Sequence, residues 1–235
     1  MELDERLHNI RERINVACEL VGRDSAEVML LPISKNHSAN NVRDLTYHGC
    51  RVFGESKIQE AKLKISACPG NLEWQLIGHL QSNKCRDAVR LFSMIQSVDR
   101  MSIAEEINRH ANNASKDMPV LLEVNVAGEG SKHGFKPTEL LDALKPINDL
   151  PRLEIHGLMT LAPWTPEPEK VRPIFHRLRE LREASEQKLG APLQHLSMGM
   201  SGDFEVAIEE GATIVRIGTA LFGPRPQPTK PKPAG

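Results

Sequence analysis

The spacing of hydrophobic residues predicts one leading helix. Residues 2–22 are amphipathic, because their apolar side chains recur every three or four positions, and Gly22 ends the pattern. The predicted buried stripe consists of Leu3, Leu7, Ile10, Ile14, Ala17 and Val21. Such a helix packs its stripe against a larger apolar surface.

Beyond this helix, short apolar runs rich in β-branched residues predict eight strands. They lie at residues 28–34, 51–54, 73–77, 93–97, 119–126, 153–159, 193–197 and 213–217. Helical patterns separate them at 39–48, 56–66, 82–91, 100–115, 137–149, 167–189 and 203–210, with a last short helix from Thr219. Alternating strands and helices build parallel sheets, and eight repeats in 235 residues fit a closed (β/α)8 TIM barrel. A doubly wound open sheet is the alternative that the pattern leaves open.

The chain is predicted to form one domain, residues 1–223, followed by a segment of different character. Residues 224–235 hold five prolines and no large apolar side chain, which is typical of an extended, disordered tail. A proline-rich ligand for a partner domain is the alternative for this tail.

Charge and composition argue against several classes of partner. The net charge is -1 at pH 7 and only 4% of residues are aromatic, so neither phosphate attraction nor base stacking is expected. The cysteines Cys18, Cys50, Cys68 and Cys85 form no C-x-x-C pair, which argues against a zinc site or a disulfide framework. No apolar leader or membrane-length run occurs. We expect a cytoplasmic monomer that binds no nucleic acid, membrane or metal.

Polar residues follow the predicted strands, at the end of a barrel where active sites form. Lys35 follows the first strand, Ser56 the second and His79 the third. Met159 ends the sixth strand and Arg216 lies near the end of the eighth. A lysine here is a candidate for chemistry, although a rim lysine with its ammonium group in solvent is the alternative.

The last two loops carry the residue types that bind phosphate. Ser201 and Gly202 precede one predicted helix, and Gly218 and Thr219 stand at the start of the next. Small residues let backbone N–H groups approach an anion, hydroxyls add donors, and TIM barrels commonly bind phosphate in these loops. Simple helix capping is the alternative.

A lysine and a phosphate site together suggest pyridoxal 5'-phosphate, which also needs a group facing its pyridine nitrogen. Lys35 can provide the amine, the two small-residue loops can hold the phosphate, and Arg216 can face the ring. A salt bridge to Glu55 or Asp203 is the alternative role for Arg216.

The sequence resembles the pyridoxal phosphate homeostasis protein family, single-domain relatives of the alanine racemase barrel. The resemblance spans about residues 28–223. The segments that carry it are SKNHS, VFGESKIQE, IGHLQSNK, VNVAGEGSKHGF, HGLMTLAP and LSMGMSGDFEVAIEEGATIVRIGTALFG.

This resemblance implies a modified (β/α)8 barrel of fold-type III with an extra N-terminal helix. Lys35 would carry the cofactor as an internal aldimine, and Arg216 would face the pyridine nitrogen. The remaining expected contacts are Ser201, Gly218 and Thr219 at the phosphate, with Ser56 and Met159 beside the cofactor. Ser56 replaces the asparagine usual in the family, and His37-Ser38 replaces a frequent proline, which puts the upper contacts in question.

The resemblance also implies a protein that buffers pyridoxal phosphate or delivers it to apoenzymes, without robust turnover. An arginine at the pyridine nitrogen disfavours ring protonation, and the only tyrosine, Tyr47, lies in a predicted helix where it cannot be a second base. A low-activity amino-acid racemase is the alternative, with His79 or His133 as the substitute base. A sugar-phosphate barrel enzyme using Glu55 and Asp203, or an interaction protein acting through the tail, also stays open.

Overall fold

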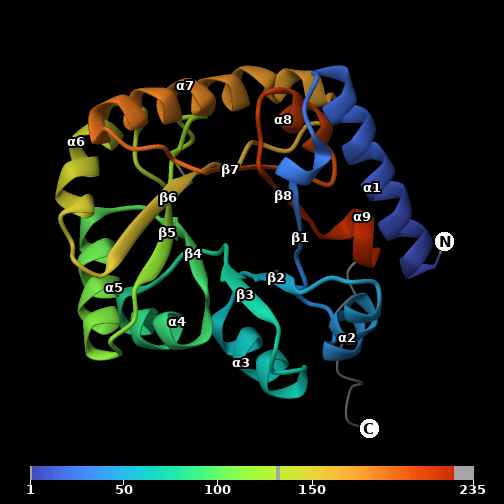
Figure 1. Cartoon of the computed structure of the whole chain (residues 1–235), viewed down its shortest axis with the longest axis horizontal. Helices are drawn as coiled ribbons and strands as arrows, with labels where there is room; N and C mark the ends of the chain where they lie inside the picture. The colour runs from blue at the N-terminus through green and yellow to red at the C-terminus, as the bar shows by residue number, and fades with distance from the viewer. Residues whose placement is uncertain (1, 131–132, 225–235) are drawn as a thin grey trace, which may run out of the picture.

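Eight parallel strands form a barrel inside a ring of helices (Figure 1). This computed structural model describes residues 2–130 and 133–224 of the chain. The strands are β1 (Met29–Pro32), β2 (Val52–Glu55), β3 (Glu73–Leu76), β4 (Met94–Val98), β5 (Met118–Glu123), β6 (Leu153–Met159), β7 (His195–Met200) and β8 (Ile214–Ile217). All eight predicted strands are therefore confirmed.

The barrel closes between β1 and β2. The paired strands run in the order β1-β8-β7-β6-β5-β4-β3-β2, and a parallel bridge between Ile33 and Gly54 joins the two ends. The Ser34 amide donates a 3.1 Å hydrogen bond to the Gly54 carbonyl. A Cβ atom at Gly54 would lie 2.4 Å from Ile33 Cδ1, so glycine permits this close approach. The closure confirms the predicted TIM barrel and excludes the open sheet.

The helices match the predicted segments closely. They are α1 (Leu3–Leu20), α2 (Ala39–Tyr47), α3 (Ile58–Ala67), α4 (Cys85–Leu91), α5 (Met101–Asn113), α6 (Pro137–Asn148), α7 (Arg172–Leu189), α8 (Phe204–Glu209) and α9 (Thr219–Phe222). Short 3₁₀ turns occupy Ser25–Glu27, Ser82–Lys84 and Pro168–Val171. The turns at Ser82–Lys84 and Pro168–Val171 form the starts of the predicted helical segments 82–91 and 167–189. The second of these turns begins with Pro168, and α7, which follows it, has another proline in its first turn.

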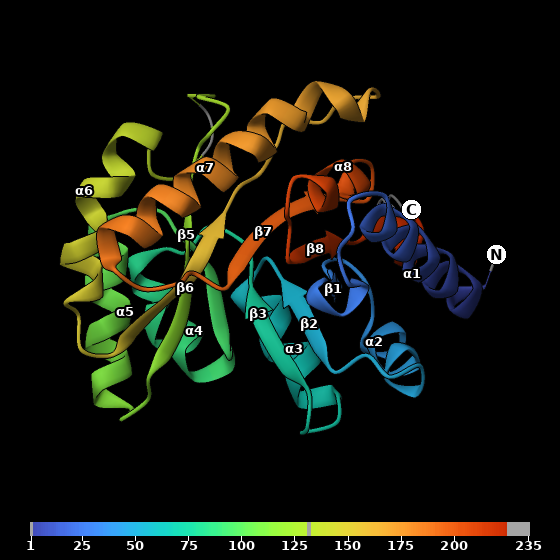
Figure 2. The same cartoon turned by 45° about the horizontal axis from the view of Figure 1, so that its top comes forward.

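The extra helix α1 packs beside α8 (Figure 2), and it also contacts α9. Arg13 on α1 forms a 2.5 Å ion pair with Glu205 and stacks its guanidinium 4.5 Å from the centroid of the Phe204 ring. The predicted stripe is buried at Leu7, Ile10, Ile14 and Ala17. The prediction that Val21 is buried is wrong, because α1 ends at Leu20 and Val21 is 41% exposed.

Two layers of core fill the molecule. The outer layer lies between the barrel and the helices. The inner layer fills the barrel with apolar side chains from five strands and from the residues directly after β1 and β3: Leu31, Ile33, Ile77, Met94, Leu121, Met159 and Ile214. Burial at roughly 25 cal/mol per Å² of apolar surface makes both layers the main stabilising contribution. The rigid barrel holds the loops at its carboxyl end.

Of the predicted proline-rich tail, residues 225–235 lie outside the described residues. Within residues 2–130 and 133–224, every helix is too short or too polar to cross a membrane.

Candidate functional site at the mouth of the barrel

Lys35 lies in a tight turn just beyond β1. The preceding Ser34 is fully buried, Lys35 itself is partly buried, and Asn36 adopts a left-handed backbone conformation with φ of 64°. Asparagine tolerates this conformation better than most residues. The turn therefore places the start of the Lys35 side chain at the carboxyl end of the barrel.

Lys64 and Glu60 on α3 clamp this turn from outside. Lys64 Nζ donates hydrogen bonds to the Ser34 carbonyl and, at 2.6 Å, to Glu60 Oε1. Glu60 in turn accepts a hydrogen bond from the Asn36 amide. The backbone groups on both sides of Lys35 are thus held by one ion pair. The sequence interpretation missed Lys64 and Glu60, because both lie inside a segment recognised only as a helix.

Glu55 at the end of β2 completes the clamp. Its Oε1 atom accepts from Lys64 Nζ at 2.6 Å and from Ser34 Oγ at 2.5 Å. Burial raises the pKa of the fully buried Glu55 carboxyl, while Lys64 and Ser34 oppose the rise. The alternative that paired Arg216 with Glu55 is wrong, because the ion-pair partner of Glu55 is Lys64.

Arg216 lies inside the barrel and is 3% exposed. Its guanidinium group donates a 2.8 Å hydrogen bond to Ser197 Oγ and a 2.7 Å hydrogen bond to the Thr160 carbonyl. Burial lowers the pKa of Arg216 to about 10, opposed by the carboxylates of Asp203 and Glu123. The guanidinium group therefore stays charged at neutral pH, and both of its hydrogen-bond acceptors are uncharged groups.

A chain of hydrogen bonds continues from Arg216 across the barrel. Ser197 Oγ donates to Gln96 Oε1 at 2.6 Å, and Gln96 Nε2 donates to Gln75 Oε1 at 2.6 Å. All four side chains are buried. The chain links β8, β7, β4 and β3, so it fixes Arg216 against the far wall. The sequence interpretation missed it, because one pair of bonded members, Ser197 and Gln96, lies 101 positions apart.

The two small-residue loops come together as predicted. The amide of Ala220, in the first turn of α9, donates a 3.2 Å hydrogen bond to Ser201 Oγ. A Cβ atom at Gly218 would lie 3.6 Å from the Ile33 carbonyl, and the His37 ring stacks 4.8 Å from the Phe222 ring. Ser201, Gly218 and Thr219 therefore lie next to the turn that carries Lys35. Asp203 accepts from the Met200 amide at 2.6 Å, a local turn contact rather than the suggested ion pair with Arg216.

Ser56 and Met159 occupy different levels of the site. Ser56 is partly buried at the end of β2, where a Cβ atom at Gly78 would lie 2.2 Å from its carbonyl. Met159 is fully buried at the end of β6 and belongs to the inner core. Ser56 is thus a rim residue, and Met159 forms part of the floor.

Two carboxylates near this mouth were missed from the sequence. Asp99 directly follows β4 and is 8% exposed. Glu123 is the last residue of β5 and 5% exposed. Burial raises the pKa of Glu123 to about 7, Asp99 adds to the rise, and Arg216 opposes it.

Comparison with known proteins identifies the family. A family described as alanine racemase, N-terminal domain, matches residues 6–226. The pyridoxal phosphate homeostasis protein of Aquifex aeolicus is 46% identical, over 96% of this chain and 99% of the relative. The protein of the same name from Pseudomonas aeruginosa is 42% identical, over 94% and 95% of the two chains. The chain belongs to the pyridoxal phosphate homeostasis protein family.

Solved structures of relatives have the same barrel. PipY of Synechococcus elongatus, in a structure with PLP bound, is 34% identical and superimposes with a TM-score of 0.82, covering 94% of this chain and 100% of PipY. Alanine racemase of Clostridium difficile superimposes with a TM-score of 0.71 at 16% identity, over 95% of this chain and 57% of the racemase chain. The second similarity is one of fold alone.

Proposed function

We propose that this protein binds pyridoxal 5'-phosphate covalently, as a Schiff base with Lys35 Nζ, and buffers or delivers the cofactor without robust turnover. The observation that carries the proposal is that the candidate cofactor contacts come together in space. The turn with Lys35, the loops with Ser201 and Gly218, and the buried Arg216 all meet at the carboxyl end of one barrel.

The residues at this mouth fit the chemical groups of the cofactor one by one. When bound, pyridoxal phosphate supplies an aldehyde that condenses reversibly with amines and a ring that withdraws electrons. Lys35 has the required amine, and Ser201 and Thr219 have hydroxyl donors beside the first turn of α9. Arg216 supplies the cation for the pyridine nitrogen, and Met159 an apolar floor.

The charge of Arg216 supports a carrier over a vigorous enzyme. Its pKa of about 10 keeps the guanidinium charged at neutral pH. A cation facing the pyridine nitrogen disfavours protonation of that nitrogen, since like charges repel. An unprotonated ring withdraws electrons less strongly, so proton removal from a bound amino acid gains less assistance.

Racemisation also needs acid–base groups on both faces of the substrate, and Tyr47 cannot supply one. Tyr47 is the only tyrosine in the sequence and is 85% exposed at the end of α2. It lies five residues before β2 starts at Val52, at the barrel end opposite Lys35. His79 beside Asp99, with 3.0 Å between Nδ1 and Oδ2, is the one observation that favours the second candidate, a low-activity amino-acid racemase.

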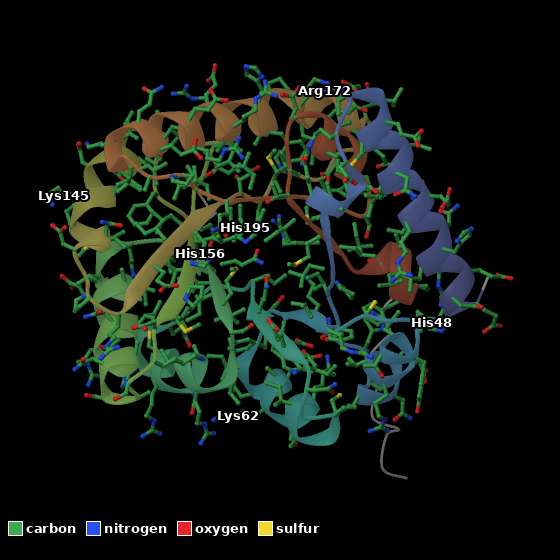
Figure 3. All side chains as sticks on the ribbon, in the orientation of Figure 1. His48, Lys62, Lys145, His156, Arg172 and His195 are labelled. Carbon is green, nitrogen blue, oxygen red and sulfur yellow. The ribbon has the colours of Figure 1, made fainter. Side chains whose placement is uncertain are left out.

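A cofactor titration tests binding and its anchor. We expect one equivalent of pyridoxal phosphate to give a protein-bound visible absorption band that Lys35→Ala abolishes. Lys62→Ala is the matched control, because Lys62 points outward from α3 and pairs with Asp87 at 2.6 Å (Figure 3). A band that survives Lys35→Ala, or one that depends equally on Lys62, overturns the assignment.

A second assay separates carrier from racemase. The loaded protein is mixed with an apoenzyme that requires pyridoxal phosphate, and in parallel with amino acids in D2O. A carrier activates the apoenzyme and exchanges the α-proton no faster than free cofactor does. Exchange well above that background, abolished by both Lys35→Ala and His79→Ala, would support the racemase.

A further inference from the structure

The rim of the barrel carries a cluster that the cofactor proposal does not use. His79 follows β3, Asp99 follows β4, and His133 lies between β5 and α6. Within residues 2–130 and 133–224, they form the one group of three or more histidine, cysteine or acidic side chains with ligand atoms all within 4.8 Å of one another. Three separate loops thus supply the group.

We propose that His79, Asp99 and His133 bind a divalent transition-metal ion of the Zn²⁺ or Co²⁺ class. Two imidazoles and one carboxylate are a ligand set that such ions accept in proteins. Three protein ligands leave a coordination position open, as in metal sites that bind water or a substrate group. The cysteines play no part, which is why cysteine spacing in the sequence gave no signal.

The separations between the ligand atoms suit a shared ion. Nδ1 of His79 lies 3.0 Å from Asp99 Oδ2, and Nδ1 of His133 lies 3.7 Å from the same oxygen. Tetrahedral Zn²⁺ with bonds near 2.0–2.1 Å holds its ligand atoms about 3.4 Å apart. The two observed separations bracket this value.

One side chain must turn for the ion to bind. The His79 and His133 rings stack with centroids 3.6 Å apart and planes 12° apart, so their nitrogen lone pairs lie in two nearly parallel planes that do not meet at one ion. Convergence on one ion requires the rings to tilt. His133 can do so because its side chain is 54% exposed, whereas the Asp99 side chain is 4% exposed and stays fixed. Metal binding therefore replaces the stacking.

A neighbouring arginine orients the Asp99 carboxylate. Arg100 Nη1 donates a 2.7 Å hydrogen bond to Asp99 Oδ1, which orients the carboxylate and leaves Oδ2 toward the two histidines.

The proposed metal site borders the candidate cofactor site without sharing a residue with it. Gly78, which precedes His79, packs against the backbone of Ser56 at the cofactor rim. A metal here would offer its open position to a carboxylate or phosphate group entering the mouth of the barrel. Because the two residue sets are separate, failure of metal binding leaves the Lys35 assignment untouched, and the reverse also holds.

Cobalt binding tests the proposal directly. Full-length protein, dialysed against a chelator and then desalted, is titrated with Co²⁺ while visible d–d absorption is recorded, and Zn²⁺ is added to compete. We expect one ion per chain. His133→Ala and Asp99→Asn should each weaken Co²⁺ binding roughly tenfold or more, since even residues outside the ligand set cost 10–100-fold.

His156→Ala is the matched control. His156 lies near His195 on β6 and β7 (Figure 3), with ring centroids 6.3 Å apart, and its Nε2 is 3.2 Å from Glu154 Oε2. Its removal deletes an imidazole with comparable neighbours and should leave Co²⁺ binding unchanged. The exposed His133 keeps the test independent of folding. Absence of a stoichiometric Co²⁺ complex, or equal loss in His133→Ala and His156→Ala, overturns the proposal.

Discussion

Glu123 shows how the barrel interior changes the chemistry of a single residue. Its carboxyl is 5% exposed at the end of β5, and burial raises its pKa from 4.5 to about 7. The folded protein therefore holds the Glu123 proton more tightly than the unfolded chain. The ionised Glu123 carboxylate therefore lowers the free energy of unfolding. This destabilisation is absent below about pH 4.5, grows as pH rises, and is complete above about pH 7.

Glu123→Gln should consequently stabilise the protein more at high pH than at low pH. Glutamine keeps the shape and removes the charge, so the expected gain is about 3 kcal/mol at pH 8 and about 1 kcal/mol at pH 5. Urea unfolding at both pH values measures the difference. The exposed Glu154→Gln on β6 is the control. A gain that is equal at both pH values, or larger at pH 5, contradicts this account of Glu123.

At the scale of elements, the clamp from α3 explains how the turn after β1 is held. Lys64 joins the Ser34 carbonyl to Glu55 and Glu60, and all of these atoms are buried or partly buried. A buried ion pair adds little net stability when intact, but removing one partner leaves an uncompensated charge. The clamp is better understood as a positioning device for Lys35.

Lys64→Met should destabilise the fold by about 3–5 kcal/mol, because Glu55 keeps its buried charge without a partner. Lys64→Met/Glu55→Gln should recover most of that loss in urea unfolding. The recovered double variant should still release pyridoxal phosphate faster than the unaltered protein, because the turn around Lys35 has lost its support. A single variant that loses less than about 1 kcal/mol, or a double variant with unchanged release, would disprove the positioning role.

The elements themselves were predictable, and the contacts between them were not. The strand at 153–159 was predicted with its observed bounds, since Leu153 and Ile155 alternate with polar residues and the segment ends before Thr160. Ser201 and Gly218 could be placed together because a parallel barrel brings adjacent loops to one end. The bond between Ser197 and Gln96 joins residues 101 positions apart, and no local pattern encodes it. The role of Lys64 could not be predicted for a related reason, since the residue pattern around it indicates only a helix.

At the scale of the whole molecule, barrel closure depends on close contact between neighbouring strands. Gly157 on β6 pairs with His195 on β7, and a Cβ atom at Gly157 would lie 1.9 Å from the His195 carbonyl oxygen. Because that neighbour is backbone, no side-chain rotation relieves the clash. The pair joins β6, which ends at Met159, to β7, which ends just before Ser201.

Gly157→Ala should therefore destabilise the protein by about 3 kcal/mol or more, at the upper end for overpacked cores. Gly70→Ala is the matched control, because no atom lies within 4 Å of the position its Cβ would take. Thermal unfolding of both variants beside the unaltered protein gives the comparison. Equal effects of the two substitutions would show that the β6–β7 contact is looser than described.

The central claim is that Lys35 anchors pyridoxal phosphate, and borohydride reduction tests it most directly. The protein is loaded with the cofactor, reduced, digested and mapped by mass spectrometry. The account predicts one phosphopyridoxyl group per chain, on the peptide containing Lys35, and none in Lys35→Ala. A modification spread over several lysines, or concentrated on one other than Lys35, would contradict the claim.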